Sequence, residues 1–338
     1  MTTQTAPPVA PAKQERRKID EGVLRNLGLV GVLVLLIVVG IITKPDLYSD
    51  PTWVKNNFLT ILQQASAIGV VTVGMTFVII GGGIDLSVGA IIALAGVWAT
   101  TLATQSYGAG GMIFTALIVG IAVGLVNGVL ISYGKLVPFI ATLAMLVAAR
   151  GLAAQISGKQ TQISANTFIN DLASTRLLGI PLLVWILGLV VAAGWVLLNR
   201  TTFGRRTVAV GGNPEAARLA GINVKRHTML LYALSGLCCG IGAIMLTSQA
   251  TSAQAAMANL YELDAIAAAI IGGTLLSGGR GTIVGALFGV LVFSTITNLF
   301  AINNLSTEVQ NMVKGAIIVA AVLIQQFRYK SLTQLFKR

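Results

Sequence analysis

Residues 58–80 read FLTILQQASAIGVVTVGMTFVII, an uninterrupted run with no charged side chain. A helix needs about 20 consecutive apolar residues to cross the hydrocarbon core of a bilayer, and roughly 17–25 are tolerated. The rest of the chain is similar, since 55% of its 338 residues are hydrophobic and only 10% are charged. A soluble domain carries about 25% charged residues. We therefore expect most of the surface to face lipid.

The same length criterion marks ten candidate membrane spans. They cover residues 26–43, 58–80, 84–104, 111–132, 137–156, 181–198, 229–249, 260–277, 281–302 and 309–327. The first resembles a signal peptide, but Lys44, Pro45 and Asp46 follow it instead of a small-residue cleavage site, so we expect a retained helix. The sequence predicts an all-α polytopic membrane protein of about ten transmembrane helices, with residues 26–327 as the transmembrane domain.

The basic residues indicate how these helices are oriented. If the N-terminus is cytoplasmic and ten helices alternate, 17 of the 23 Lys and Arg residues fall on the cytoplasmic side and four on the outside, with Arg150 and Lys314 near span ends, where they can snorkel. Both termini are therefore expected in the cytoplasm, with a disordered basic segment over residues 1–25 and a basic tail over 328–338. Clusters separated by uncharged stretches are not the pattern of a nucleic-acid-binding surface.

Catalytic and metal-binding residues are scarce. Cys238 and Cys239 are neighbours in an apolar run, where a disulfide is hard to form, and His227 is the only histidine. The sequence lacks the phosphate-loop, zinc-protease and serine-hydrolase motifs. We expect no catalytic, metal or cofactor site, so any uphill transport must draw energy from another subunit or from coupled ions.

The first break in the apolar pattern lies at residues 81–89, which read GGGIDLSVG. Three glycines end a helix, and the side-chain oxygens of Asp85 and Ser87 can cap the next one. Alternatively, this is a break beside the solute pathway, since irregular backbone at membrane depth is tolerated where it is buried or lines a wet cavity. Gly82, Gly83, Asp85 and Ser87 are the candidate pathway or gate residues.

The second break is a long, basic cytoplasmic loop, residues 199–228. Within it Asn213 suits an N-cap, Pro214 the first helical position, Glu215 the first turn and Gly221 a helix stop. This pattern predicts a helix of about two turns, too short to span a membrane. Such a helix is shaped to dock into a groove on a cytoplasmic partner, and the alternative is a surface helix held by lipid headgroups.

The third break begins at residues 261–264, which read YELD. Glu262 and Asp264 lie about 200° apart on a helix, so they cannot share a face. They are expected as interfacial, capping or ion-pairing groups and not as a proton-relay pair. Residues 275–281 then form a glycine-rich cytoplasmic turn, with Arg280 available to pair with a neighbouring loop.

Two glycine patterns occur within or beside the spans. Gly120, Gly124 and Gly128 repeat at every fourth position, which lets helices approach closely in lipid, and we expect a packing seam there. The sequence Ile-Ile-Gly-Gly occurs at 79–82 and again at 270–273. Transporters are often built from repeats, but these two stretches fall at non-equivalent places in the expected topology.

Four longer stretches together resemble the permease subunits of ribose-type ABC sugar importers. They are MTFVIIGGGIDLSVGA at Met75–Ala90, VPFIATLAMLVAARG at Val137–Gly151, GGNPEAARLAGINV at Gly211–Val224 and YELDAIAAAIIGGTLLSGGRGTIVGA at Tyr261–Ala286. The resemblance implies a complex in a bacterial cytoplasmic membrane, with two permease subunits, identical or paralogous, a cytoplasmic ATPase and an extracytoplasmic sugar-binding protein. It implies import of a monosaccharide, a ribose-like pentose or a hexose.

In such importers a short cytoplasmic helix with a Glu-Ala-Ala…Gly pattern couples ATP hydrolysis to the permease. Here the candidate coupling residues are Asn213, Pro214, Glu215, Ala216, Ala217, Arg218 and Gly221. The Ile-x-Leu-Pro segment that follows in some coupling loops is absent from this sequence.

Two other classes of protein compete with this one. An ion-coupled secondary transporter would need buried carboxylates near the middle of the membrane, whereas the acidic residues here fall at the ends of expected spans. A membrane scaffold that transports nothing would not need the pattern of the 199–228 loop.

Overall fold

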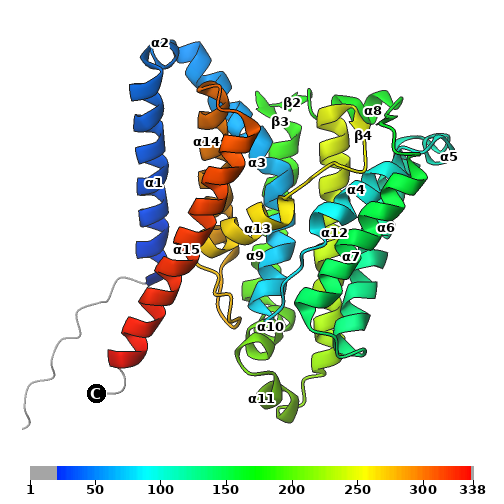
Figure 1. The fold of residues 1–338 in the computed structure, drawn as a ribbon, viewed down its shortest axis with the longest axis vertical. Helices are drawn as coiled ribbons and strands as arrows, with labels where there is room; N and C mark the ends of the chain where they lie inside the picture. The colour runs from blue at the N-terminus through cyan, green and yellow to red at the C-terminus, as the bar shows by residue number, and fades with distance from the viewer. Residues whose placement is uncertain (1–20, 336–338) are drawn as a thin grey trace, which may run out of the picture.

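The computed structural model describes residues 21–335, without the side chains of residues 21, 23, 24 and 324–335. Fifteen helices form a bundle (Figure 1): α1 (Glu21–Thr43), α2 (Pro45–Tyr48), α3 (Pro51–Ile80), α4 (Val88–Ala99), α5 (Leu102–Gln105), α6 (Gly108–Ser132), α7 (Pro138–Ile156), α8 (Thr167–Asp171), α9 (Leu182–Arg200), α10 (Thr202–Gly212), α11 (Pro214–Leu219), α12 (Val224–Ala250), α13 (Tyr261–Ile271), α14 (Ile283–Ile302) and α15 (Thr307–Leu335).

Four short strands lie at the edge opposite α10 and α11 (Figure 1). They are β1 (Gln162–Ile163), β2 (Arg176–Leu177), β3 (Ile180–Pro181) and β4 (Ser252–Ala253). β1 pairs antiparallel with β4, and β2 pairs antiparallel with β3. They tie connecting loops together and form no core of their own.

The expected count of about ten transmembrane helices is wrong. Within the described residues, the helices long and apolar enough to cross a membrane are seven: α1, α3, α6, α7, α9, α12 and α14. Seven of the ten expected spans fall on these helices. The chain is all-helical, as the sequence predicts, but the expected spans 84–104, 260–277 and 309–327 are not among the seven.

Two of the missing spans are half-length helices. The stretch 84–104 gives the 12-residue α4 and then the separate short α5, and 260–277 gives only the 11-residue α13. At about 1.5 Å per residue each helix is less than 20 Å long, against a hydrocarbon core of about 30 Å. Both lie near mid-height in the molecule (Figure 1). Hydropathy predicted full spans here because segments buried inside the protein are as apolar as segments that face lipid.

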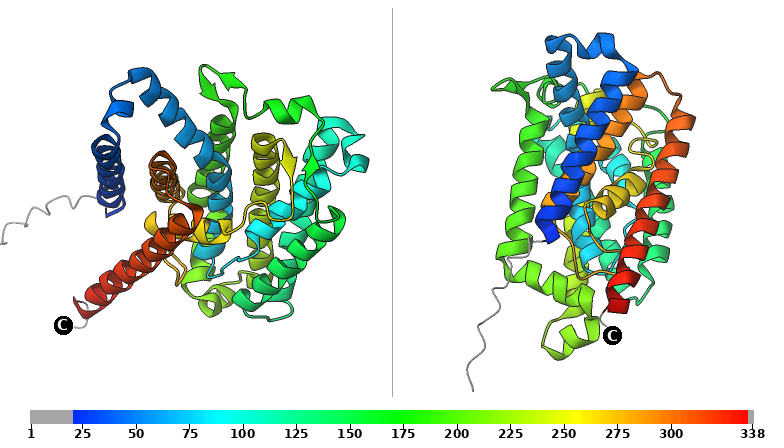
Figure 2. Two further views of the ribbon diagram at one scale, coloured as in Figure 1. Left: turned by 45° about the horizontal axis from the view of Figure 1, so that its top comes forward. Right: turned by 90° about the vertical axis from the view of Figure 1, so that its left-hand side faces the viewer.

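The last expected span, 309–327, lies within α15. This helix begins with polar residues, including Glu308, Gln310 and Lys314, and the side chains of its second half lie outside the described residues. In the left view of Figure 2, α15 extends away from the body of the bundle. It packs mainly against α13.

Two helices occupy the centre of the bundle. Almost every residue of α3 from Ala65 to Ile80 is buried, and α12 packs on α3, α4 and α6. The outer helices instead expose large apolar side chains, such as Leu35 on α1, Phe114 on α6, Val147 on α7 and Leu189 on α9. These exposed apolar side chains are what a protein with lipid as its solvent requires.

α1 begins and α15 ends at the edge of the molecule that also holds α10 and α11 (Figure 1). The expected segments 1–25 and 328–338 lie wholly or largely outside the residues whose side chains are described. Their place in the cytoplasm therefore stays a prediction.

The glycine seam of α6 packs against α12. A Cβ on Gly120 would collide with the Gly236 carbonyl oxygen, and one on Gly124 would collide with the Tyr232 carbonyl oxygen. A Cβ on Gly128 would lie 2.7 Å from the Met229 Cα. The obstacles are backbone atoms, so they cannot move aside as a flexible side chain would. The three glycines set the distance between two central helices.

Gly124→Ala is expected to destabilise the fold by about 1–3 kcal/mol, because the added methyl group overpacks a backbone contact. The matched control is Gly110→Ala on the same helix, where a Cβ would meet nothing within 4 Å. Thermal unfolding of the two purified variants in detergent measures the difference. Equal melting temperatures would show that α6 and α12 are not held together at this seam.

Candidate functional site

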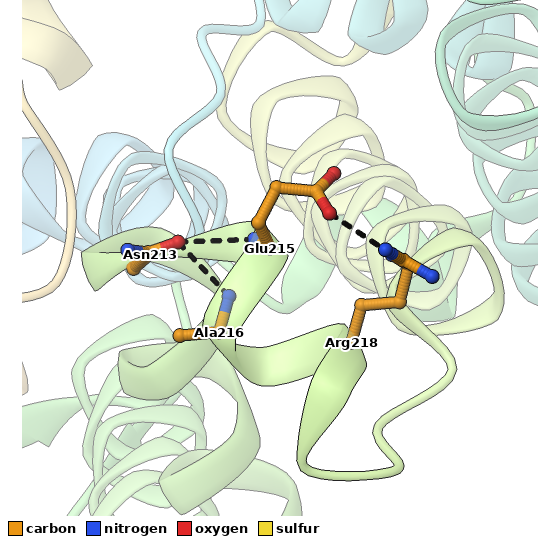
Figure 3. Close-up of polar contacts among 4 residues, drawn as sticks. All are labelled: Asn213, Glu215, Ala216 and Arg218. Atoms are coloured by element: carbon orange, nitrogen blue, oxygen red, sulfur yellow. Dashed lines mark hydrogen bonds and ion pairs between the residues drawn. The ribbon is translucent and has the colours of Figure 1, made fainter.

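The loop between α9 and α12 carries α10 and α11 beyond the end of the bundle (Figure 1). Figure 3 shows how α11 begins: the side-chain oxygen of Asn213 accepts hydrogen bonds from the backbone N–H groups of Glu215 at 3.1 Å and Ala216 at 3.0 Å. Pro214 takes the first helical position. Gly221 ends this segment with φ +81°, a conformation that favours glycine. The capping residues thus occupy the positions in the helix that the sequence predicts. The coupling role of this helix stays a prediction.

Most of α11 faces outward. Glu215 and Arg218 form an exposed ion pair, with the Arg218 Nε 3.0 Å from a Glu215 carboxylate oxygen (Figure 3). Leu219 is 78% exposed, which is unusual for a leucine outside the membrane-facing helices. Ala217 is instead buried at 4% exposure. The exposed surface of α11 is thus made by Glu215, Ala216, Arg218 and Leu219, while Ala217 packs against its own chain.

The three glycine-rich breaks of the sequence meet in space, just before α11. We call the contact of Gly82, Gly211, Gly278 and Gly279 the glycine junction. The backbone N–H of Gly279 donates to the Ile80 carbonyl oxygen at 2.8 Å. No local pattern in the sequence predicts that these three breaks touch.

The junction is too tight for side chains. A Cβ on Gly211 would collide with the Ile80 carbonyl oxygen and lie 2.8 Å from the Gly279 nitrogen. A Cβ on Gly278 would lie 3.0 Å from the Gly82 Cα, and Gly278 has φ +82°. The junction therefore joins the loop that carries α11 to the end of α3 and to the turn between α13 and α14.

The Ile-Ile-Gly-Gly repeat corresponds to a shared helix ending. Gly82 ends α3 with φ +85° and donates to the Ile79 carbonyl, and Gly273 ends α13 with φ +87° and donates to the Ile270 carbonyl. Both are C-terminal caps in which glycine adopts the left-handed conformation. The repeat thus reflects two equivalent helix ends.

The expected cap of α4 by Asp85 and Ser87 takes another form. Asp85 accepts from the Ser87 N–H at 3.0 Å, from the Ser87 hydroxyl at 2.6 Å and from the Ser235 hydroxyl at 3.1 Å. The Asn127 side chain donates to the Ser87 hydroxyl oxygen at 2.8 Å. Ser87 makes no side-chain bond to the first turn of α4. These buried groups form one cluster that joins the start of α4 to α6 and α12.

The four candidate gate residues thus lie in two environments. Gly82 belongs to the glycine junction, and Gly83 packs against the Tyr232 hydroxyl. Asp85 and Ser87 are fully buried. All four lie in the loop between α3 and α4.

Two of the acidic residues that were expected at span ends are buried inside the protein. Asp85 is fully buried and Glu262 is 7% exposed, because the half-length helices α4 and α13 begin inside the protein. Asp264 pairs with Lys314 at 2.9 Å, one of the roles expected for it. Arg150 and Lys314 both have partners within the protein, since Arg150 donates to the Ala255 carbonyl at 2.7 Å and Lys314 pairs with Asp264.

A cavity of about 200 Å³, which the sequence did not predict, lies beside the Asp264–Lys314 pair. Its lining comes from α3, α12, α13, α14 and α15: Gln64, Ile68, Gln249, Tyr261, Asp264, Ala268, Val290, Phe293, Ser294, Thr297 and Lys314. The feature of the sequence that could have indicated this cavity is the presence of amide and hydroxyl side chains inside apolar runs.

Comparison with known proteins gives a consistent result over nearly the whole chain. The family described as branched-chain amino acid transport system / permease component matches residues 57–322. The chain is 40% identical over 316 residues to the ribose import permease protein of Bacillus subtilis, covering 93% of this chain and 96% of that protein. It is 36% identical over 329 residues to the L-arabinose ABC transporter permease protein of Azospirillum brasilense (96% and 95%).

The chain is also 34% identical over 320 residues to the galactose/methyl galactoside import permease protein of Escherichia coli strain K12, covering 88% of this chain and 93% of that protein. No solved structure matches the chain.

Proposed function

The chain belongs to this family of transport-system permease components, and from that premise we propose that it is the membrane-spanning subunit of an ABC importer for a monosaccharide. Relatives that cover nearly the whole chain are named for ribose, L-arabinose and galactose, so the solute class is a pentose or a hexose. The chain is a transporter subunit and not an enzyme, and its place is the bacterial cytoplasmic membrane. A partner ATPase supplies the energy, and a sugar-binding protein delivers the solute on the opposite side.

The observation that carries the coupling mechanism is the exposed surface of α11. Glu215, Arg218 and Leu219 stand away from the bundle in a basic loop, and no other part of the described chain covers them. An exposed ion pair adds little to the stability of its own helix, so these charges are available to a partner. We assign α11 as the helix that docks on the ATPase.

The glycine junction supports a route from α11 into the membrane. A displacement of α11 acts through Gly211 on the ends of α3 and of the α13–α14 turn, because backbone in direct contact cannot absorb the motion. The Asp85 cluster lies at the other end of the α3–α4 break. We assign Gly82, Gly83, Asp85 and Ser87 to a gate that opens when this break moves.

The complex is proposed to hold two permease copies, identical or paralogous. The competing assignment is an ion-coupled transporter that needs no ATPase. The buried carboxylates of Asp85 and Glu262 suit that class better than the sequence suggested. Family membership decides for the importer, since the relatives named above include a permease explicitly described as part of an ABC transporter.

Reconstitution separates the two classes. The chain is placed in vesicles with or without its ATPase and binding protein, and uptake of labelled ribose, arabinose and galactose is measured together with ATP turnover. The importer requires all components and ATP. Uptake by the chain alone, driven by an ion gradient, would falsify the assignment.

Asp85→Asn is expected to reduce uptake about tenfold or more. The amide replaces one accepting oxygen with an NH₂ group, which faces a group that donated a hydrogen bond to the carboxylate. Losing such a buried hydrogen bond costs about 1–3 kcal/mol. ATPase binding should persist, since α11 is untouched, so ATP turnover without uptake is the predicted signature. Asp46→Asn, at an exposed position outside the spans, is the control. Normal uptake by Asp85→Asn would remove the cluster from the gate.

A further inference from the structure

The cavity beside α15 is small, and residues of five helices line it. Its volume of about 200 Å³ lies below the about 300–1,000 Å³ typical of drug-sized sites, so it suits a small solute. It lies inside the half of the protein that holds α13, a half-length helix at mid-height in the bundle (Figure 1). Polar groups at this depth are costly in a membrane protein and usually mark a solute or ion pathway.

The hydrogen-bonding groups of the cavity are only partly used by the protein. Among the described residues, the Gln64 side chain, the Ser294 hydroxyl and the Tyr261 hydroxyl have no hydrogen-bond partner, although all three line the cavity. Gln249 donates to the Gln63 carbonyl at 3.1 Å, which leaves its side-chain oxygen free to accept. These groups come from four helices and include both donors and acceptors.

The only charges on the lining cancel each other. The Lys314 ammonium lies 2.9 Å from the Asp264 carboxylate, and their side chains are 19% and 16% exposed. A site with a matched ion pair does not favour a charged solute of either sign. The ammonium keeps two further N–H donors and the carboxylate a second oxygen, so the pair can still bind hydroxyl groups.

Other lining residues are apolar. Ile68, Val290, Phe293 and Ala268 supply aliphatic and aromatic surface within the same cavity. A sugar ring presents C–H groups on its faces and hydroxyls around its rim. A lining that combines apolar surface with unused donors and acceptors suits a solute of this kind.

We propose that this cavity is a transient binding subsite for a neutral polyhydroxylated solute of monosaccharide size on its way across the membrane. Asp264, Lys314, Gln64 and Ser294 supply its polar contacts. The inference rests on the proposed function and deepens it. α13, which carries Asp264, leads into the turn that holds Gly278 and Gly279, so the glycine junction links the subsite to α11.

Labelling of a reporter cysteine tests the subsite directly. Thr297→Cys places a thiol on the lining, and Thr297 is a neutral choice because its hydroxyl donates to the Phe293 carbonyl of its own helix at 3.1 Å. Background labelling of the native cysteines should be low, since Cys238 and Cys239 are both buried. Alkylation by a small maleimide is followed in vesicles with and without ribose, and with sodium glutamate as a charged solute. Ser106→Cys, on an exposed outer loop, is the control.

Ribose at about ten times its dissociation constant should slow labelling of Thr297→Cys about tenfold, while glutamate and the Ser106→Cys control show no change. Protection should be lost when Asp264→Leu and Lys314→Met are combined, which removes both charges without leaving one unpaired. Protection that survives this double change would overturn the assigned contacts.

The outcomes separate this inference from the proposed function. If complete vesicles import ribose but ribose never protects Thr297→Cys, the subsite is wrong and the importer stands. If complete vesicles import no sugar while protection is seen, the importer assignment fails and the subsite stands. Protection by glutamate equal to that by ribose would overturn the neutral-solute assignment.

Discussion

Gly211→Ala is expected to abolish ATP-driven uptake, although it adds a single methyl group to the chain. That methyl group would collide with the Ile80 carbonyl oxygen and crowd the Gly279 nitrogen, so three backbone segments would have to separate. Overpacking of a tight contact costs about 1–3 kcal/mol, and here the atoms displaced are backbone. The hydrogen bond from Gly279 to Ile80 would be lost with it.

The neighbouring residue provides a closely matched control. A Cβ on Gly212 would meet nothing within 4 Å, and Gly212 lacks a positive φ. Gly212→Ala should therefore import sugar at the wild-type rate. Uptake, ATP turnover and melting temperature are measured for both variants in the same vesicles. A Gly211→Ala protein that imports normally would show that the three breaks are not in contact.

The features that the sequence predicts well are local. Asn213, Pro214 and Gly221 specify a short capped helix through hydrogen bonds and backbone preferences that involve only neighbouring residues. The seam of Gly120, Gly124 and Gly128 is equally readable, because its spacing follows from helix geometry. Such signals depend on nothing distant in the chain.

The errors concern burial, which is a property of the whole fold. Hydropathy cannot distinguish an apolar stretch that faces lipid from one that is wrapped by other helices, so α4 and α13 were expected as full spans. The same error placed Asp85 and Glu262 at the ends of full spans. The Asp264–Lys314 pair joins residues fifty positions apart, and no local pattern announces it.

Burial also changes which residue tests the coupling helix. A bulky side chain at Ala217 would disturb the packing of α11 on its own chain, because Ala217 is 4% exposed. Loss of transport there would not distinguish failed docking from a misfolded loop. The exposed residues Glu215 and Arg218 are the informative positions.

Glu215→Arg is expected to abolish uptake and to release the ATPase during purification, while the permease keeps its melting temperature. The Glu215 side chain is 74% exposed, so its replacement disturbs no core. It places two like charges on one face of α11, in a loop that is already basic. A residue at the centre of an interface often contributes about 2 kcal/mol or more to the free energy of binding. Its loss would weaken binding of the ATPase at least about thirtyfold.

The exchange Glu215→Arg with Arg218→Glu separates docking from helix stability. It restores an ion pair of about the same geometry within α11 but reverses both charges that face a partner. If α11 docks on the ATPase through these charges, the exchanged protein should remain as defective as Glu215→Arg alone. If uptake returns, the pair matters only within its own helix, where an exposed pair contributes at most about 1 kcal/mol, and the docking surface must lie elsewhere on the loop. Because both proteins carry the same loop length and the same buried Ala217, the comparison measures the charge pattern of α11 alone.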